Sequence, residues 1–337
     1  MMDPKYITKL TYEGLKDCTD NFSDKNYIGR FQFGKVYHGK IRWGFPKPHY
    51  VTVKIWECPK SDILISRANK MRMKDEIILL RHEKLINHPG MVPVVAYCSE
   101  GEHFAVVYDF KSLGTVYNFT RRDDFSWLQR IKVALQIACV LKFLHVRNPV
   151  YEPFLVRNIQ ASHILLDEEF SPKLYDFGMI TGGIFPDRRD SNTQFVSEWN
   201  GSVKMSSYVP EKWTEKTDVF AFGVVLLNLL TKSVFIEEEE GEGERERERP
   251  CLREWPPVMY LTDWGTEWSL HRSLEADQLF CELDGSRIIE LAKQCLESDP
   301  TDRPTMKQVV RDLMKLQIVQ RHAETLLGRV AKKRSTS

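Results

Sequence analysis

The stretch that most constrains this chain lies near its middle, at residues 157–167 and 175–178. A polar loop with Arg157 and Asn158 leads into an apolar run, Ile164-Leu165-Leu166. A second loop, Asp176-Phe177-Gly178, follows shortly afterwards. The side chains that could carry chemistry are concentrated in these two loops, so the other segments are interpreted around them.

Composition and charge limit the kind of protein. The chain has 337 residues, more than one average domain. Its hydrophobic content of 42% and aromatic content of 11% are sufficient for a full core. The net charge of +1 argues against a nucleic-acid-binding surface, which would need an excess of Lys and Arg.

Cysteines and apolar segments indicate the compartment. The seven cysteines are far apart and form no C-x-x-C pair, so neither a zinc site nor a disulfide framework is expected. The longest apolar stretch, 219–230, is shorter than the roughly 20 residues that cross a bilayer. The chain opens with neither a signal peptide nor a myristoylation signal. We therefore expect a soluble intracellular protein without a transmembrane segment.

The two central loops resemble the catalytic loop, H-R-D-L-x-x-x-N, and the metal-binding loop, D-F-G, of protein kinases. Several chemical groups of that pattern are replaced. Val156 stands in place of His, and Asn158 in place of the Asp that accepts the substrate proton. Gln160 replaces a Lys that is common in serine/threonine kinases, and His163 replaces the Asn that holds a second magnesium ion. Asp176 is retained, and the resemblance implies that it would hold Mg²⁺ if a nucleotide binds.

Residues 28–37 resemble the kinase glycine-rich loop, G-x-G-x-x-G-x-V, which lays backbone N–H groups over the ATP phosphates. Ile28 precedes the motif, and Gly29, Gly34 and Val36 match it. The middle glycine is Phe31, at a position where the backbone must approach the phosphates closely. We expect Phe31 to hinder nucleotide binding or to fold inward over the site. Taken alone, the fragment also fits an ordinary hairpin with two turn glycines.

The segment 51–55 alternates like a half-buried strand and resembles V-A-I-K, whose Lys would be Lys54. The helix expected at 71–80 offers Glu76 as its ion-pair partner, with Glu83 as the alternative. A solvated helix glutamate is the third interpretation.

The segment 103–110 resembles the strand that leads into the hinge of a kinase, so Tyr108 is expected to guard the pocket, and Asp109 and Phe110 are expected to face adenine. The implied cofactors are ATP and Mg²⁺. Whether they bind is left open, because Lys54, Glu76 and Asp176 remain while Phe31 obstructs.

Three longer segments are similar to the plant receptor-like cytoplasmic kinase superfamily: 125–145, 214–231 and 295–306. In the second of them, Asp218 is expected to brace the backbone of the catalytic loop. The resemblance implies an α+β, bilobal protein-kinase-like fold, with a small five-stranded N-lobe carrying one main helix and a large, mostly helical C-lobe. The expected division is a leader at 1–27, an N-lobe at 28–110, a C-lobe at 111–318 with a disordered acidic insertion at about 237–249, and a basic tail at 319–337.

The replaced groups predict impaired phosphate transfer. An amide at Asn158 cannot take a proton, and loss of a general base typically costs a factor of about 10²–10⁴ in rate. Gln160 removes a cation, and His163 is a poor ligand for Mg²⁺, which prefers oxygen. All three changes act in the same direction, so we expect a pseudokinase.

The lost proton acceptor, the helix at 214–231 and the short leader resemble one group in particular, the HopZ-ETI-deficient-related pseudokinases of plant innate immunity. Membership would imply a cytosolic adaptor or decoy, held at the plasma membrane only through its partners. Those partners would be a coiled-coil NLR immune receptor, other receptor-like cytoplasmic kinases and bacterial effectors. Two alternatives stay open: a weakly active serine/threonine kinase and a nucleotide-gated scaffold.

Overall fold

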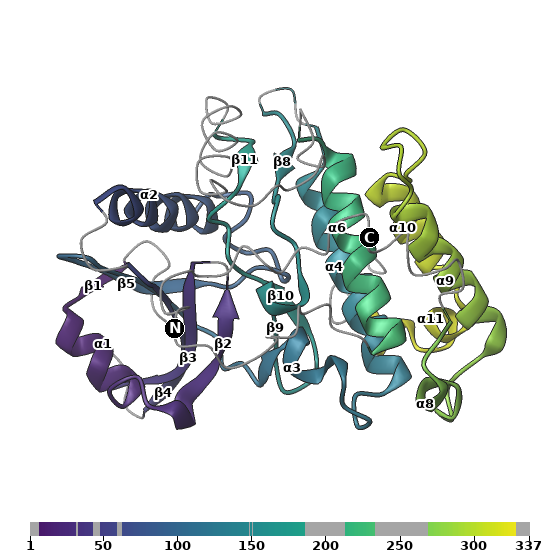
Figure 1. Ribbon diagram of the computed structural model, residues 1–337, viewed down its shortest axis with the longest axis horizontal. Coiled ribbons are helices and arrows are strands. Elements are labelled where there is room, and N and C mark those ends of the chain that lie inside the picture. The colour runs from purple at the N-terminus through teal and green to yellow at the C-terminus, as the bar shows by residue number, and fades with distance from the viewer. Residues whose placement is uncertain are drawn as a thin grey trace, which may run out of the picture. The chain divides into compact units, whose positions relative to one another are not determined.

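The computed structural model describes residues 7–31, 33–42, 48–58, 63–147, 149, 151–185, 213–232 and 269–327. These residues form two compact units (Figure 1). The first unit contains 7–118 and 162–178, and the second contains the described residues of 119–161 and 179–327. The acidic insertion expected at 237–249 and the end of the basic tail lie outside the described residues.

The first unit is built on a six-stranded sheet of order β1-β5-β6-β4-β3-β2. Only the pair β1–β5 is parallel, and the other neighbours are antiparallel. The strands are β1 (Thr8–Leu10), β2 (Tyr27–Phe31), β3 (Gly34–Ile41), β4 (His49–Trp56), β5 (Val94–Glu100) and β6 (His103–Tyr108).

The sheet has one strand more than the five expected, because part of the predicted leader joins it. β1 pairs in parallel with β5, and α1 (Tyr12–Thr19) follows directly. The hydroxyl of Thr11 caps α1 by accepting from the N–H of Gly14 at 3.1 Å. Leu15 and Cys18 are buried against β3 and β5. The segment is therefore part of the core of this unit.

Helix α2 (Ile63–Leu80) packs on β5 and β6 of the sheet, as Figure 1 shows. Its buried residues include Ile65, Asn69, Met73, Glu76 and Leu80. Steps of three and four residues place them on one face of a helix. This spacing carries Glu76 inward together with its apolar neighbours.

A second sheet of the first unit, of order β10-β9-β7, positions the residues of the two central loops. It consists of β7 (Gly114–Thr115), β9 (Ile164–Leu166) and β10 (Pro172–Leu174). Leu174 pairs with Ile164 across the antiparallel β9–β10 hairpin. The residues just before β9 and just after β10 therefore lie at the same end of the hairpin, which brings His163 close to Asp176.

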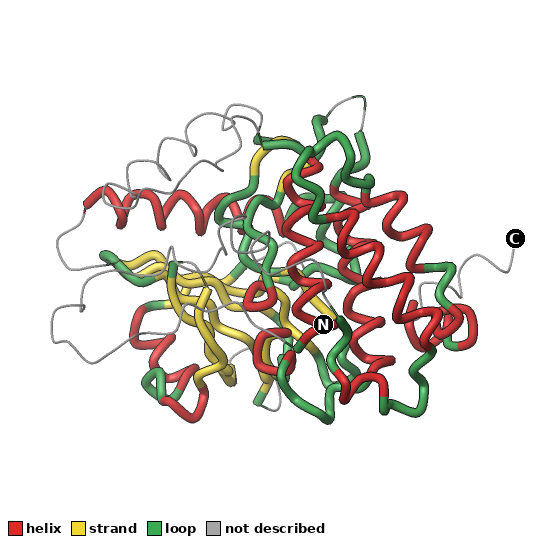
Figure 2. Tube along the Cα trace, turned by 45° about the vertical axis from the view of Figure 1, so that its right-hand side comes forward, coloured by secondary structure: helices red, strands yellow, loops and turns green. Residues whose placement is uncertain are grey.

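The described part of the second unit is mostly helical, and its helices α4, α6, α9 and α10 run beside one another (red in Figure 2). Ser126 and Gln129 form a capping box at the start of α4, and Thr214 and Thr217 form one at the start of α6. Its elements are α4 (Trp127–Leu144), β8 (Phe154–Leu155), β11 (Thr181–Gly182), α6 (Glu215–Thr231), α8 (Arg272–Glu275), α9 (Glu282–Cys295), α10 (Met306–Leu313), α11 (Gln317–Arg321) and α12 (Ala323–Leu327).

Two short elements lie where the chain passes between the units: α3 (Val116–Thr120) and the 3-10 turn η2 (Ala161–His163). Another 3-10 turn, η1 (Asp24–Asn26), precedes β2. The bilobal architecture expected from the sequence, a strand-rich part with one main helix and a helical part, is confirmed. No helix among the described residues combines the length and the apolar character that a membrane crossing requires.

Candidate functional site

Lys54 is the centre of a buried ionic cluster in the first unit. β4 places its side chain inward, where it is fully buried. The ammonium lies 2.5 Å from Oε2 of Glu76 and 2.6 Å from Oδ1 of Asp176. The structure thus places Glu76, and not Glu83, beside Lys54.

Glu76 has three donors to its carboxylate. Besides Lys54, the hydroxyl of Tyr108 donates to Oε1, and the N–H of Phe177 donates to Oε2 at 3.1 Å. Burial raises the pKa of Glu76, while the charge of Lys54 opposes that rise. Burial, followed by the nearby Glu76 carboxylate, raises the pKa of Tyr108 well above its ordinary value. Tyr108 therefore stays a neutral donor.

Asp176 uses both carboxylate oxygens. Its Oδ1 faces Lys54, and its Oδ2 lies 3.3 Å from Nδ1 of His163, which is also buried. Burial opposes ionisation of Asp176, but Lys54 and then His163 outweigh it, so the pKa of Asp176 lies below its ordinary value. The backbone of Asp176 is in the left-handed region, with φ of 63°.

Two aromatic rings enclose the ammonium of Lys54 on the sheet side. The centroid of the Phe31 ring lies 4.4 Å from Nζ, and that of Trp56 lies 4.3 Å away. The rings meet edge to face at 83°, with centroids 5.6 Å apart. Each such cation–π contact is worth about 0.5–2 kcal/mol. Phe31 therefore points into the site, which is one of the two outcomes expected from the sequence.

Gly34 permits this arrangement of the rings. It pairs with Phe31 on one side and with Trp56 on the other. A Cβ atom at Gly34 would lie 1.9 Å from the carbonyl oxygen of Ile55, so the close approach of the strands requires glycine here. The packing thus explains the need for glycine at position 34 independently of phosphate binding.

The remaining residues of the predicted glycine-rich loop lie on the β2–β3 hairpin. Ile28 and Val36 are buried, and Gly29 pairs with Val36. A Cβ atom at Gly29 would meet no heavy atom within 4 Å. Contacts of Ile28, Gly29 and Val36 with a nucleotide stay predictions.

Asp109 and Phe110, expected to face adenine, have backbone partners within the first unit. The N–H of Asp109 donates to the carbonyl of Pro93 at 2.8 Å, and the Asp109 carboxylate pairs with His49. The carbonyl of Phe110 accepts from the hydroxyl of Thr52 at 2.7 Å. Their role toward adenine stays a prediction.

Residues 156–161 of the predicted catalytic loop belong to the second unit, where Asp218 holds the loop. The N–H groups of Val156 and Arg157 donate to its carboxylate at 2.9 and 2.8 Å, and Nε2 of His145 lies 2.9 Å from it. The prediction that Asp218 braces this loop is confirmed. Asn158 is buried within the loop.

Arg157 and Gln160 complete this loop. The Arg157 guanidinium lies over the ring of Trp213, 4.5 Å from its centroid. Burial lowers the pKa of Arg157 to about 10, and Asp218 opposes the shift. Gln160 is half-buried.

Three aromatic residues of these clusters were missed or left without a defined role in the sequence analysis: Trp56, Tyr108 and Trp213. Trp56 could have been recognised, because it lies two residues after Lys54 on the same face of a strand. Tyr108 was expected only to guard the pocket. Trp213 has no signal in the local pattern, since its contact with Arg157 joins segments far apart in the sequence.

The first unit contains residue types that bind ATP and Mg²⁺ in kinases, but the ammonium of Lys54 is not exposed to solvent. Lys54 and Asp176 are the groups that a kinase uses for phosphate and metal. Here the ammonium is fully buried among Phe31, Trp56, Glu76 and Asp176. The Phe31 ring, at the position of the middle glycine in the kinase pattern, is one of these neighbours. Within the described ranges, no group of three or more His, Cys, Asp or Glu is arranged to hold a metal ion.

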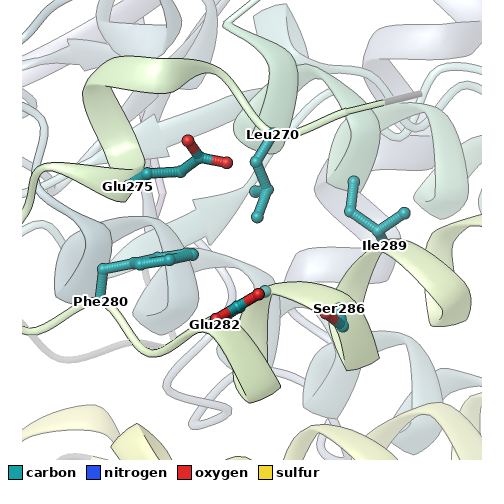
Figure 3. Close-up of a pocket in the computed structure, with 7 residues that line it drawn as sticks. Leu270, Glu275, Phe280, Glu282, Ser286 and Ile289 are labelled. Carbon is teal, nitrogen blue, oxygen red and sulfur yellow. The ribbon is translucent and has the colours of Figure 1, made fainter. Parts of the chain in front are cut away.

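A separate open pocket of about 480 Å³ lies in the second unit (Figure 3). Gly285 lets its walls meet, since a Cβ atom there would lie 2.6 Å from Cδ1 of Leu270 and 2.8 Å from Cζ of Phe280. None of its lining residues belongs to the sequence motifs discussed above. They are Leu270, Glu275, Phe280, Glu282, Gly285, Ser286 and Ile289.

Comparison with known proteins identifies relatives for almost the whole chain. Residues 22–313 match the family described as protein tyrosine and serine/threonine kinase. The serine/threonine-protein kinase PBL16 of Arabidopsis thaliana is 29% identical over 331 residues, covering 94% of this chain and 75% of its own. An EPD1-interacting receptor-like cytoplasmic serine/threonine-protein kinase of Nicotiana benthamiana is 31% identical over 314 residues, covering 90% of this chain and 63% of its own.

Other relatives are much longer. A leucine-rich repeat receptor-like serine/threonine-protein kinase of Arabidopsis thaliana is 30% identical over 323 residues. The match covers 93% of this chain but only 33% of that relative. The chain therefore spans about a third of the length of such receptor-like proteins.

Proposed function

Because the chain belongs to the protein tyrosine and serine/threonine kinase family, we propose that it is a pseudokinase that acts by binding other proteins. The observation that carries this proposal is the enclosure of Lys54. Its ammonium is fully buried, and the rings of Phe31 and Trp56 lie 4.4 and 4.3 Å from it. The group that would hold the phosphates of ATP is thus occupied by the protein itself.

The residue types of the catalytic loop support the same proposal. A kinase orients and deprotonates the acceptor hydroxyl with an Asp, and the amide of Asn158 cannot take that proton. Losing such a base costs a factor of about 10²–10⁴. Nδ1 of His163 contacts the Asp176 carboxylate, where an oxygen ligand for Mg²⁺ would be needed.

We place the protein's work in the cytoplasm of a plant cell, as an adaptor or decoy of innate immunity. The relatives named receptor-like cytoplasmic kinases support the cellular setting. The resemblance to the HopZ-ETI-deficient-related pseudokinases supports the partners. These are a coiled-coil NLR immune receptor and receptor-like cytoplasmic kinases on which bacterial effectors act, with contact to the plasma membrane through those partners.

A second candidate function is that of a weakly active serine/threonine kinase. The intact ion pair of Lys54 with Glu76 favours it, because an active kinase needs this pair, together with an Asp that holds Mg²⁺, to position ATP. Family membership makes binding of ATP and Mg²⁺ possible. The two candidate functions differ in whether the protein transfers phosphate from ATP to a substrate.

A transfer assay separates the two candidates. The purified chain, a Lys54→Ala variant and an Asp176→Asn variant are each incubated with γ-labelled ATP, Mg²⁺ and a general kinase substrate. The pseudokinase proposal expects equal incorporation in all three. Incorporation by the wild type that exceeds both variants would replace it with the second candidate.

The adaptor role is tested by affinity purification of the tagged chain from plant tissue, followed by identification of the bound proteins. A coiled-coil NLR receptor in the eluate is the expected result. Asn158→Asp should leave its amount unchanged, because the binding role does not use the proton acceptor. Absence of any NLR receptor, or its loss in Asn158→Asp, would contradict the proposal.

A further inference from the structure

We propose that the outer face of α2 is a docking surface for an acidic amphipathic helix of a partner protein. Four large apolar side chains of this helix are exposed to solvent: Ile63 by 75%, Leu64 by 66%, Met71 by 53% and Ile78 by 52%. Clustered exposed apolar residues on a folded protein mark interaction sites more often than isolated ones do. α2 thus combines a buried face with an apolar exposed face.

Three of these residues form a straight row. Leu64, Met71 and Ile78 recur at every seventh position. Seven residues make almost two turns of an α-helix, so successive members of the row are displaced by only about 20°. At a rise of about 1.5 Å per residue, the row extends for about 21 Å along the helix. This length matches about four turns of a second helix laid alongside.

Basic side chains accompany the apolar row. Arg67 and Lys74 are exposed and lie three residues beyond Leu64 and Met71, and Lys70 is exposed next to Met71. None of the exposed residues within Ile63–Leu80 is acidic, since Asp75 is half-buried and Glu76 is buried. The face therefore presents apolar groups and positive charge together.

The inner face of α2 keeps this surface in place. Met73 and Leu79 are fully buried, and Glu76 is tied to Lys54 and Tyr108. The outward row is not needed for that packing, because the inward residues already cover the sheet. A partner would meet a helix whose orientation is fixed before binding, which lowers the entropic cost of docking.

The charge and shape of this face together indicate which kind of partner it fits. A partner helix with an apolar row and flanking Glu or Asp would bury Leu64, Met71 and Ile78 and pair with Arg67, Lys70 and Lys74. A second copy of α2 would bring like charges together across the apolar row. The face also lacks the exposed aromatic residues typical of helices that lie on membranes. We therefore choose a protein helix over a second copy or a lipid surface.

This inference is independent of the pseudokinase proposal, because none of the proposed contact residues takes part in phosphate transfer. It stands whether or not the chain transfers phosphate. A single helix buries a small area, so we expect weak, reversible binding of the kind found in transient interfaces.

A designed peptide tests the surface directly. The probe is a fluorescein-labelled, helix-stapled peptide of three heptads, with Leu at each seventh position and Glu on both sides of that row. Its binding to the full chain is followed by fluorescence anisotropy. The wild type should bind it, and Met71→Glu/Ile78→Glu should weaken binding at least tenfold.

Charge reversal and a matched control complete the test. Lys70→Glu/Lys74→Glu should also lose at least tenfold in affinity and should prefer a peptide in which Lys replaces each Glu. The control is Leu283→Glu, an exposed apolar residue of α9 in the second unit, 48% exposed, which should bind like the wild type. Thermal melting of each variant checks that it is folded, which is expected because every changed side chain is exposed.

Four results would overturn the proposal. Equal affinity of the wild type and Met71→Glu/Ile78→Glu would show that the row is not used, and equal binding of the Lys peptide would show that charge does not select. Concentration-dependent dimers in sedimentation experiments that vanish in Ile78→Glu would assign the face to a second copy. Pelleting with phosphatidylserine vesicles that is lost in Met71→Glu/Ile78→Glu would assign it to a membrane.

Discussion

At the scale of single residues, Phe31 determines how the Lys54 cluster behaves. The kinase pattern has glycine at this position, which leaves space for phosphate oxygens. Here the phenylalanine ring instead contacts both the ammonium of Lys54 and the ring of Trp56. Glu76 and Asp176 balance the charge of the buried Lys54 ammonium, and the rings of Phe31 and Trp56 complete its surroundings.

Replacing Phe31 by glycine should open the cluster to nucleotide. We expect no thermal shift of the wild type with millimolar ATP·Mg²⁺ and a clear stabilisation of Phe31→Gly, each measured against its own ligand-free form. A ligand present at about 100 times its Kd stabilises by about 2.7 kcal/mol. Phe31→Gly/Lys54→Ala is the control and should not respond. A shift of the wild type as large as that of Phe31→Gly would contradict this role of the ring. Phe31→Ala repeats the test if the glycine variant is unstable.

The buried ion pair of Glu76 should be costly to break. Glu76→Gln leaves the Lys54 ammonium with less compensating charge in a dry interior, and removing one partner of such a pair typically costs about 3–5 kcal/mol. Urea denaturation should show this loss in the free energy of unfolding. Glu83→Gln is the matched control, because Glu83 is exposed and surface substitutions usually change stability by less than about 0.5 kcal/mol. Similar losses in both variants would contradict the assignment of Glu76.

His88 predicts a pH dependence of stability. Its Nδ1 accepts from the N–H of Gly90 at 3.1 Å, and protonation would remove that acceptor. Burial, and then the charge of Lys173, lower the pKa of His88 to about 4, below the usual 6.5. The unfolded chain therefore binds more protons between these values, so the free energy of unfolding should fall as the pH drops from about 6.5 to about 4. His88→Gln should show a flatter profile in urea denaturation, and an unchanged slope would refute this origin.

At the scale of elements, α1 and β1 show how a short segment becomes part of a core. β1 has only three residues, and it pairs in parallel with β5, a strand that lies far along the sequence. α1 supplies Leu15, which is fully buried against the sheet. The segment that the sequence analysis described as a leader is therefore held in place by packing against residues that are distant in the sequence.

Leu15→Ala should measure this packing. The substitution removes buried methyl groups and leaves a cavity, which typically costs about 2–5 kcal/mol. Differential scanning calorimetry should show a lower melting temperature. Glu13→Ala, on the exposed side of α1, loses only the surface pair with Lys16 and should change little. A melting temperature equal to that of the wild type would mean that α1 does not stabilise the fold.

The sequence predicted these elements unequally. Lys54 and Glu76 were predicted from the resemblance of their segments to kinase motifs, with strand alternation supporting Lys54, because both motifs are local. The bracing of the catalytic loop by Asp218 followed from a long family resemblance. β1 was missed because three residues carry no periodicity. Trp56 was missed although it lies two residues after Lys54 on the same face of β4. The contact of Trp213 with Arg157 depends on tertiary packing, which a single sequence does not display.

At the scale of the whole molecule, the contacts that support each unit are present, while several residues of the kinase catalytic pattern are replaced. Asp218 holds the catalytic loop through two backbone N–H groups and His145, as an active kinase would require. Arg303 donates to the carbonyls of Glu297 and Lys216, which ties α6 to the segment before α10. These contacts stabilise the architecture and do not depend on transfer. Surfaces such as the outer face of α2 are thus presented by an intact kinase scaffold.

Under the pseudokinase proposal, restoring transfer should need two changes of different kinds. Phe31→Gly admits the nucleotide, and Asn158→Asp supplies the proton acceptor, so neither alone should raise phosphate incorporation above the Lys54→Ala background. The double variant should exceed that background by a factor of about 10²–10⁴ if the general base contributes as usual. Because residues that act as a unit are not additive, the gain should appear only in the double variant. His163 and Gln160 are unchanged and should keep its rate below that of an active kinase. Equal incorporation by Asn158→Asp alone would mean that Phe31 does not limit nucleotide access.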